Sequence, residues 1–343
     1  MFFASDNGSG AAPEIMAALQ RANEGYALRY GADAIMDRVR ERIRAVFDAP
    51  EAAVYLVATG TAANALSLAI HSQPWTAVFC HDAAHIAVDE CGAPEFYTGG
   101  AKLMPVPGAH GKMTVETLSQ TLARISHGDV HSVQRGVLSI TNVTEAGTLY
   151  SPAEIAALTA VAKANGMPCH LDGARFANAV VARGATAAEM TWKAGIDVVS
   201  FGGTKNGCMG VEAVVMFDPA KAWEFELRRK RAGHLFSKHR YLSAQMEAYL
   251  TDDLWLRLAA HANTMGQRLA QGMARVPDAR LVHSVDANML FPEWALGTHD
   301  RAEAKGAIYS RGPATDGRET ARLVASWQTT EKDVHDLLDA LMP

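Results

Sequence analysis

Residues 167–175 read Met-Pro-Cys-His-Leu-Asp-Gly-Ala-Arg, and this stretch decides the fold. Its first five residues form a mostly apolar run, which is typical of a strand buried on both faces of a sheet. Asp172 follows the run directly, and residues 174–183 have a helical composition. The stretch therefore predicts a strand–turn–helix unit with polar side chains at the point where the strand ends.

The same unit recurs along the chain. Further helical stretches begin at Pro13 and cover residues 33–47 and 151–165. They alternate with apolar runs at residues 53–57, 77–80, 136–140, 197–201 and 211–217. Short apolar strands that are separated by helices predict a mostly parallel sheet covered by helices. The sequence therefore predicts a large α/β domain.

The pattern changes after Pro219. Long helices are predicted at residues 221–232 and 240–272, short strands at 279–282, 288–291 and 321–326, and a closing helix at 331–341. This order is typical of a small α+β domain. The first dozen residues are rich in Gly, Ser, Asp and Asn and are expected to be extended. We therefore expect an N-terminal arm at 1–12, a large domain at 13–240 and a small C-terminal domain at 241–343.

Composition limits the classes of partner. The 343 residues are 49% hydrophobic and 20% charged, with a net charge of −5 and scattered Lys and Arg, so neither nucleic acid nor a membrane surface is expected as a partner. No signal peptide is predicted, and Thr59-Gly60-Thr61 interrupts the most apolar stretch, residues 52–70. Four cysteines lie far apart, without metal-ligand spacing: Cys80, Cys91, Cys169 and Cys208. A reduced, cytoplasmic protein without a metal site is expected.

Ligands of open α/β sheets bind at the carboxyl ends of the parallel strands. Thr59-Gly60-Thr61 follows the strand at 53–57 and opens a helix, where free N–H groups suit a phosphate. The alternative is a plain turn capped by Thr61. His85 follows the strand at 77–80 and can stack on a planar ligand and move a proton, although a histidine at such a place is often only hydrogen-bonded.

Two more strand ends carry polar residues. Asp172 can face a cationic ring nitrogen with Arg175 reaching the same ligand, or it can simply cap the following helix. Thr204-Lys205 follows the strand at 197–201 among small residues, where desolvation would make the lysine amine nucleophilic. The alternative is a surface loop lysine. Together the four strand ends supply a Schiff-base lysine, a carboxylate, a stacking ring and a phosphate cradle, which are the parts of a pyridoxal-phosphate site.

These residues resemble the threonine aldolase family, a branch of the aspartate-aminotransferase-like (fold type I) pyridoxal-phosphate enzymes. The most specific match is His-Leu-Asp-Gly-Ala-Arg at residues 170–175. Other matches are Ser5-Asp6-Asn7, Tyr30-Gly31-Ala32-Asp33, Gly60-Thr61, Ala84-His85-Ile86, Glu90-Cys91-Gly92, Lys205 and Arg322-Leu323-Val324. The likeness is greatest to the low-specificity L-threonine aldolase and phenylserine aldolase group.

The resemblance implies roles for the cofactor site. Lys205 would hold pyridoxal phosphate through a Schiff base, Asp172 would pair with its ring nitrogen, and His85 would stack on the ring and transfer a proton. Glu90 is a second acid–base candidate. The phosphate would lie against Gly60, Thr61 and Thr204.

The resemblance also implies a substrate site. Arg175 and Arg322, with Ser5, would hold the substrate carboxylate or oxygens of the cofactor. Tyr30 would come from a neighbouring subunit, since fold type I sites lie at a dimer interface; a dimer is expected as the minimal unit and a tetramer as the assembly. The basic stretch from Arg228 to Arg231, continued at 238–240, resembles a segment that reaches a partner's phosphate, and its alternative is a solvated helix face.

The implied reaction is retro-aldol cleavage of L-threonine, L-allo-threonine and related β-hydroxy-α-amino acids to glycine and an aldehyde. Many family members carry a histidine near the substrate hydroxyl, but the corresponding stretch here, residues 141–145, has none. The preference between threo and erythro substrates therefore stays open. Alternatives on the same scaffold are β-elimination, transamination and racemisation. A nucleotide-binding protein is disfavoured because neither the dinucleotide-binding nor the P-loop motif occurs.

Overall fold

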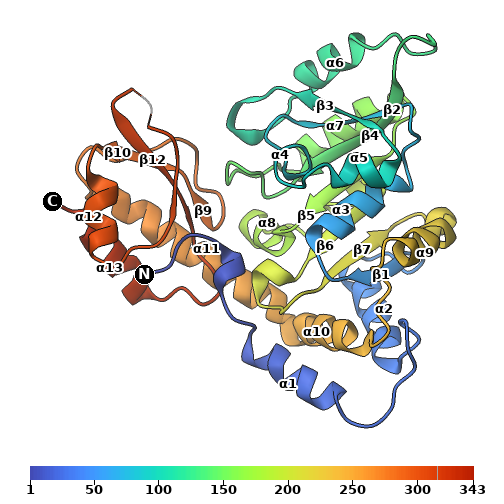
Figure 1. Cartoon of the computed structure of the whole chain (residues 1–343), viewed down its shortest axis with the longest axis horizontal. Coiled ribbons are helices and arrows are strands. Elements are labelled where there is room, and N and C mark those ends of the chain that lie inside the picture. Colours follow the sequence, from blue (N-terminus) through green and yellow to red (C-terminus); the bar gives the residue numbers. More distant parts are fainter. Residues whose placement is uncertain (315) are drawn as a thin grey trace.

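A seven-stranded sheet forms the centre of the larger part of the molecule (Figure 1). The structure, a computed structural model, describes residues 1–314 and 316–343. The strand order is β1-β7-β6-β5-β4-β2-β3. The strands are β1 (Ala53–Val57), β2 (Thr76–His81), β3 (Lys102–Val106), β4 (Gln134–Thr141), β5 (Cys169–Gly173), β6 (Val198–Gly202) and β7 (Glu212–Met216). Only β7 runs antiparallel to its neighbours, β1 and β6, so the prediction of a mostly parallel sheet is confirmed.

Both faces of this sheet are covered, which explains why its strands lack polar–apolar alternation. On β7, Ala213 and Val215 join the core cluster beneath α2, α7 and α8, whereas Val214 and Met216 join the cluster beneath α3 and α9. The helices of this part are α1 (Pro13–Ala22), α2 (Ala34–Val46), α3 (Gly60–Ala69), α4 (His85–Val88), α5 (Ala93–Thr98), α6 (Val115–Ala123), α7 (Pro152–Ala164), α8 (Phe176–Arg183) and α9 (Ala222–Arg231).

A smaller antiparallel sheet follows in the C-terminal part, and the N-terminal arm lies against it (Figure 1). Its strands are β8 (Arg280–Leu281), β9 (Met289–Leu290), β10 (Pro292–Ala295), β11 (Ser310–Arg311) and β12 (Arg318–Val324), and its short helices are α12 (Thr298–Ala304) and α13 (Glu331–Leu341). Phe3 is fully buried in the core of this part. Its N–H donates to Ile308, and its carbonyl accepts from the Val324 N–H. The predicted extended arm is thus fixed to the small sheet.

The helix predicted at residues 240–272 is wrong in one respect, because it is two helices. α10 (Arg240–Leu250) and α11 (Leu254–Met273) are separated at Asp252 and Asp253, which both have φ values near +50° (51° and 52°). Aspartate tolerates this left-handed conformation better than most residues, and it ends the helix. α10 packs against α1 and α2. The domain boundaries at residues 12 and 240 stay a proposal.

Within the described residues, none of the helices has the length and apolar character needed to cross a membrane.

Candidate active site

Side chains from four strand ends line one cavity of about 300 Å³ at the carboxyl edge of the large sheet. Seven of the predicted residues are in its lining: Gly60, Thr61, His85, Glu90, Asp172, Thr204 and Lys205. They come from segments that are up to 145 positions apart in sequence, between residues 60 and 205. Four other predicted residues, Ser5, Tyr30, Arg175 and Arg322, are not in the lining.

The turn after β1 presents the N-terminus of α3 to the cavity. Thr59, rather than Thr61, caps this helix, because its Oγ1 accepts from the Ala62 N–H at 3.2 Å. The hydroxyl of Thr61 is therefore not used as the cap. The first N–H groups of a helix have no intrahelical partner and carry a partial positive charge, so Gly60 and Thr61 form an anion-binding position.

A hydrogen-bonded chain of four side chains crosses the cavity floor. Nδ1 of His85 lies 2.8 Å from Oε1 of Glu90. Nδ2 of Asn64, on α3, donates to the same Glu90 oxygen and to Oδ2 of Asp172, each at 2.9 Å. Asn64 thus stands between two carboxylates that would otherwise repel each other. The chain joins the predicted stacking histidine to the predicted partner of the ring nitrogen.

Electrostatics within this chain make His85 more basic. Its hydrogen bond with Glu90 raises the pKa of His85, against the opposing effect of burial. Burial raises the pKa of Glu90, and the nearby Asp172 carboxylate adds to this rise, while the hydrogen bond with His85 opposes it. Because a carboxylate can only accept, the contact fixes a proton on Nδ1 of His85. Nε2 lies 3.5 Å from Oδ2 of the exposed Asp89.

Lys205 lies in a short 3₁₀ turn, η4 (Thr204–Asn206), directly after β6. The turn is held from below, since the side chain of Asn206 donates to the Tyr249 hydroxyl and to the Trp255 carbonyl at 2.7 and 2.8 Å. Gly202 is required just before it, because a side-chain carbon there would lie 2.3 Å from the Ala174 carbonyl oxygen. The lysine amine is therefore presented to the cavity by a rigid support.

Arg175 lies behind the cavity and is paired within the chain. It makes a two-pronged contact with Asp6 of the N-terminal arm, at 2.6 and 2.9 Å, and both side chains are buried. Burial opposes the ionisation of Asp6, but the charge and hydrogen bonds of Arg175 outweigh it and lower the pKa of Asp6. Arg175 keeps Nη1 without a hydrogen-bond partner among the described residues.

The arm also reaches the second predicted arginine. Arg322, on β12, donates through Nη2 to the Ala4 carbonyl at 3.2 Å. Ser5 caps the short turn η1 (Asp6–Gly8), where its Oγ accepts from the Asn7 N–H at 3.1 Å. Asn7, two residues after Ser5, lines the cavity. The arm thus ties Arg175, Arg322 and the cavity together.

Tyr30 lies away from the cavity of its own chain. The amine of Lys230 lies 5.1 Å from the centre of the Tyr30 ring. The hydroxyl of Ser237 lies 3.4 Å from the hydroxyl of Tyr30. In the basic stretch, Arg228 pairs with Glu224, and Arg229 is buried against Glu226 and the Leu56 carbonyl. Arg228 and Arg229 are therefore held by contacts within the chain and do not form the solvated helix face that was the alternative prediction for this stretch.

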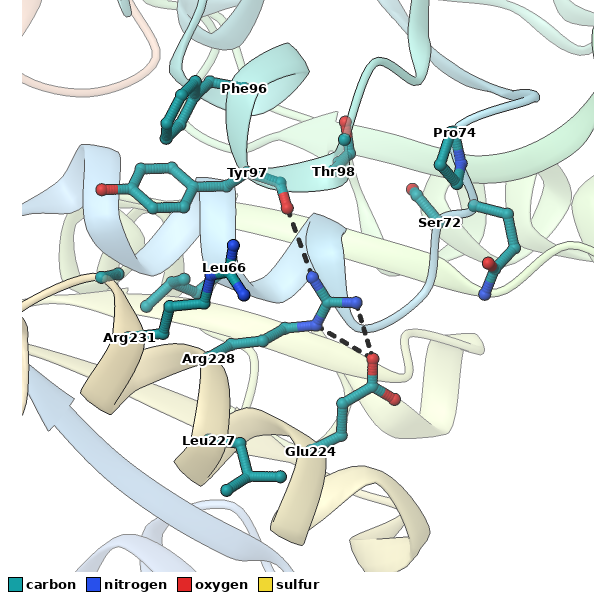
Figure 2. Close-up of a pocket in the computed structure, with 13 residues that line it drawn as sticks. Leu66, Ser72, Pro74, Phe96, Tyr97, Thr98, Glu224, Leu227, Arg228 and Arg231 are labelled. Atoms are coloured by element: carbon teal, nitrogen blue, oxygen red, sulfur yellow. Dashed lines mark hydrogen bonds and ion pairs between the residues drawn. The ribbon is translucent and has the colours of Figure 1, made fainter.

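A larger cavity, of about 750 Å³, lies elsewhere, between α3, α5 and α9 (Figure 2). Its wall is largely apolar, with Phe96 and Leu227 on opposite sides. Arg228 crosses it and is satisfied by Glu224 and by the Tyr97 carbonyl. Arg228 and Arg231 of the basic stretch line it, but none of the residues predicted for the cofactor or the substrate does, so its size does not make it the candidate site.

Sequence reasoning missed several residues of the site. They are Asp6 as a partner of Arg175, Asn64, Glu145 and Glu212, of which the last three line the cavity. Glu145 ends the stretch 141–145 that lacks the family's histidine, and its position after β4 was a usable signal. Glu212 begins the antiparallel strand β7, whose start lies at the edge where its neighbours end.

The cavity suits a flat, anionic cofactor. A side-chain carbon added to Gly60 would meet nothing within 4 Å, so the start of α3 opens onto free space. Two buried acceptors in the cavity floor, Oε2 of Glu90 and Oδ1 of Asn64, have no hydrogen-bond partner in the described part of the chain. The lining thus combines an anion position, an amine, unsatisfied acceptors and an imidazole, which is a set that fits pyridoxal phosphate. No group of three or more potential metal ligands occurs among residues 1–314 and 316–343.

Comparison with known proteins agrees with this geometry. The model of the beta-eliminating lyase family matches residues 3–295. Two curated relatives named low specificity L-threonine aldolase, from Pseudomonas sp. (strain NCIMB 10558) and Pseudomonas aeruginosa, are each 40% identical over 335 residues, covering 98% of this chain and 95% of theirs. A solved threonine aldolase structure from Leishmania major superposes with a TM-score of 0.93 at 29% identity, covering 99% of this chain and 98% of that one.

The predicted aspartate-aminotransferase-like fold type I is thereby confirmed. The relative and the solved structure cover 98% and 99% of this chain. The similarity therefore includes both the large sheet and the C-terminal part. The chain belongs to the low-specificity L-threonine aldolase family.

Proposed function

We propose that the chain is a pyridoxal-phosphate-dependent aldolase that cleaves L-threonine and L-allo-threonine to glycine and acetaldehyde. The observation that carries the proposal is the convergence of Lys205, Asp172, His85 and the N-terminus of α3 on one cavity. The curated relatives with 40% identity bear the corresponding name. Related β-hydroxy-α-amino acids, phenylserine among them, are further substrates under this proposal.

Six of the cavity residues would hold the cofactor. Lys205 would bind it covalently, Asp172 would pair with its ring nitrogen, and His85 would stack on its ring. Gly60, Thr61 and Thr204 would bind its phosphate. When bound, pyridoxal phosphate draws electrons from the α-carbon of an attached amino acid. The negative charge of Asp172, held in place by Asn64, keeps the ring nitrogen protonated for this purpose.

The arginines select which bond breaks. With the cofactor bound, the orientation of the substrate carboxylate would decide which bond to the α-carbon breaks. Arg322 and Nη1 of Arg175 would hold that carboxylate with Ser5, which lies on the arm between Ala4 and Asp6, the residues that contact the two arginines. Charge-assisted hydrogen bonds from a guanidinium to a carboxylate are strong and directional, which suits this task.

His85 moves the proton of the substrate's β-hydroxyl group. Its Nδ1 is committed to Glu90, so Nε2 is the atom that takes the proton. The negative charge of Glu90 stabilises the imidazolium that forms. Glu145 belongs to the stretch 141–145 that lacks the family's histidine, and it faces the same cavity, so it influences the choice between threo and erythro substrates.

A second copy of the chain completes the site. The cavity contains four carboxylates, Glu90, Glu145, Asp172 and Glu212, against the one amine of Lys205. A bound phosphate needs more positive charge than this. The side chain of Arg231 is exposed and makes no hydrogen bond or ion pair with any described residue. Tyr30 is 38% exposed. Both side chains are suited to reach the cavity of a neighbouring subunit, so we infer a dimer as the minimal unit. The family resemblance implies a tetramer as the assembly. Sedimentation velocity measures the oligomeric state.

The reaction is tested by product analysis. Purified, cofactor-loaded protein is incubated with L-threonine, L-allo-threonine and L-threo-phenylserine, and glycine and aldehyde are quantified. The proposal predicts equal amounts of both products. A 2-oxo acid with ammonia would indicate β-elimination instead, and a 2-oxo acid without ammonia would indicate transamination. The ranking of the three substrates measures the consequence of the missing histidine in the stretch 141–145. A cytoplasmic location rests on the cysteine usage and stays a prediction.

A further inference from the structure

Glu212 is a buried carboxylate between the two loops that form the cofactor site. β7 runs antiparallel, so its first residue lies at the edge where β1 and β6 end. Glu212 pairs in register with Val57, just before the Thr59–Thr61 turn, and with Gly202, just before the Lys205 turn. Its side chain lines the cavity together with both turns.

The carboxylate of Glu212 supports the Lys205 turn. Its Oε2 accepts from the Gly203 N–H at 2.8 Å, and it also accepts from Thr204. A residue that satisfies these backbone groups fixes the position of the lysine that follows them. No carboxylate is needed for this alone, because an amide oxygen at the same place would accept the same bonds.

The charge of Glu212 is unfavourable for a cofactor phosphate. A phosphate at Gly60, Thr61 and Thr204 would add about two negative charges to the cavity that the carboxylate of Glu212 lines. Other groups that face Glu212 cannot relieve this: Cys208 and Tyr249 have pKa values that burial raises well above their usual ranges, so both stay neutral. Among the described residues, Lys205 is the cation that acts on Glu212, and it would be committed to the cofactor.

We propose that Glu212 is a positioning residue for Lys205 and that it takes up a proton when the phosphate of the cofactor binds. The inference rests on the proposed function, since it assumes a phosphate at the start of α3. A protonated Glu212 no longer repels the phosphate and still accepts the N–H of Gly203. Burial raises the pKa of Glu212 to about 7, so the proton is available near neutral pH.

The test measures cofactor binding rather than turnover. Full-length protein, freed of cofactor by dialysis, is titrated with pyridoxal phosphate at pH 6 to 9, as wild type and as Glu212→Gln. As the pH increases from 6 to 9, the Kd of the wild type for pyridoxal phosphate is expected to rise relative to the Kd of Glu212→Gln. The rise is about tenfold for each unit by which the bound phosphate raises the pKa of Glu212. Glu303→Gln, which removes an exposed carboxylate on α12, is expected to follow the wild type.

Pyridoxal, which lacks the phosphate, is the matched ligand. The two proteins are expected to show the same pH dependence with it. The wild type alone gives a second measurement if Glu212→Gln does not fold: between pH 7 and 9, where the phosphate is already a dianion, its Kd must rise more for pyridoxal phosphate than for pyridoxal.

A Kd ratio between wild type and Glu212→Gln that stays constant from pH 6 to 9 would overturn the inference. If both proteins still cleave threonine, the proposed function stands and Glu212 is only a support for the turn. Failure of the wild type to bind pyridoxal phosphate at any pH would instead overturn the proposed function and this inference with it.

Discussion

Nδ1 of His85 lies 2.8 Å from Oε1 of Glu90, a buried carboxylate five residues later in the chain. The contact orients the imidazole, fixes its tautomer and raises its pKa. Through Asn64, the same carboxylate is joined to Asp172. The residue proposed to move the proton and the residue proposed to hold the ring nitrogen therefore belong to one connected group.

Glu90→Gln tests the proton transfer. Removing the carboxylate lowers the pKa of His85, and a base works only when it is unprotonated. The acid limb of the pH profile of kcat/KM for threonine cleavage should therefore move to lower pH. Above that limb, kcat/KM should fall by about tenfold, because a base of lower pKa takes up the proton less readily. Asp82→Asn is the control, since it removes the exposed carboxylate beside His81 at the same sheet edge. An unmoved acid limb in Glu90→Gln would show that His85 is not the base.

Asn64→Asp tests the bridge between the carboxylates. The change replaces a donor by a third negative charge between Glu90 and Asp172, so cofactor affinity and turnover should fall by about a hundredfold. Asn64→Ala removes the donor without adding charge and should cost clearly less. Equal losses in the two variants, measured by cofactor titration, would mean that Asn64 contributes only packing.

Asp6→Asn tests how the N-terminal arm is held. The change leaves Arg175 buried without a counter-charge, which typically costs about 3 kcal/mol of unfolding free energy. Asp300→Asn removes the exposed partner of Arg311 and should cost less than about 1 kcal/mol. Urea unfolding of the cofactor-free proteins compares the two. A loss in Asp6→Asn no larger than in its control would contradict the tie between the arm and Arg175.

Glu212 also predicts a pH dependence of stability. Its folded pKa of about 7 is raised above its ordinary value of 4.5, so the folded state binds a proton more tightly than the unfolded state does. The contribution of Glu212 to the free energy of unfolding of the cofactor-free protein should therefore fall by about 3 kcal/mol as the pH rises from about 4.5 to 7. Above pH 7 this contribution should stay level. In Glu212→Gln this contribution is absent. If urea unfolding at pH 5 and pH 8 gives the same difference between variant and wild type, Glu212 is ionised throughout.

The sequence predicted the large sheet because its strands are buried on both faces and therefore read as apolar runs between helices. β3 (Lys102–Val106) was not predicted, since it is an edge strand whose Lys102 and Pro105 are exposed and break the run. The break at Asp252 and Asp253 was also missed, because an apolar stripe continues on both sides of it.

The cavity residues that could be predicted stand at the ends of parallel strands, where a general rule places ligands. Glu212 escaped this rule because it begins an antiparallel strand. Asp6 escaped it because its partner Arg175 is 169 positions away, and only the folded arm brings the two together. Asn64 lies inside an apolar helix, where nothing in the local pattern distinguishes it from a core residue.

The most direct test of the central claim is to find which lysine carries the cofactor. The protein is loaded with pyridoxal phosphate, reduced with borohydride so that the cofactor becomes permanently attached, digested, and mapped by mass spectrometry. The structure predicts one modified residue, Lys205, and Lys205→Ala should carry no label and lack both the cofactor's visible absorbance and threonine cleavage. A label on another lysine with Lys205 unmodified, or cleavage that survives in Lys205→Ala, would contradict the account.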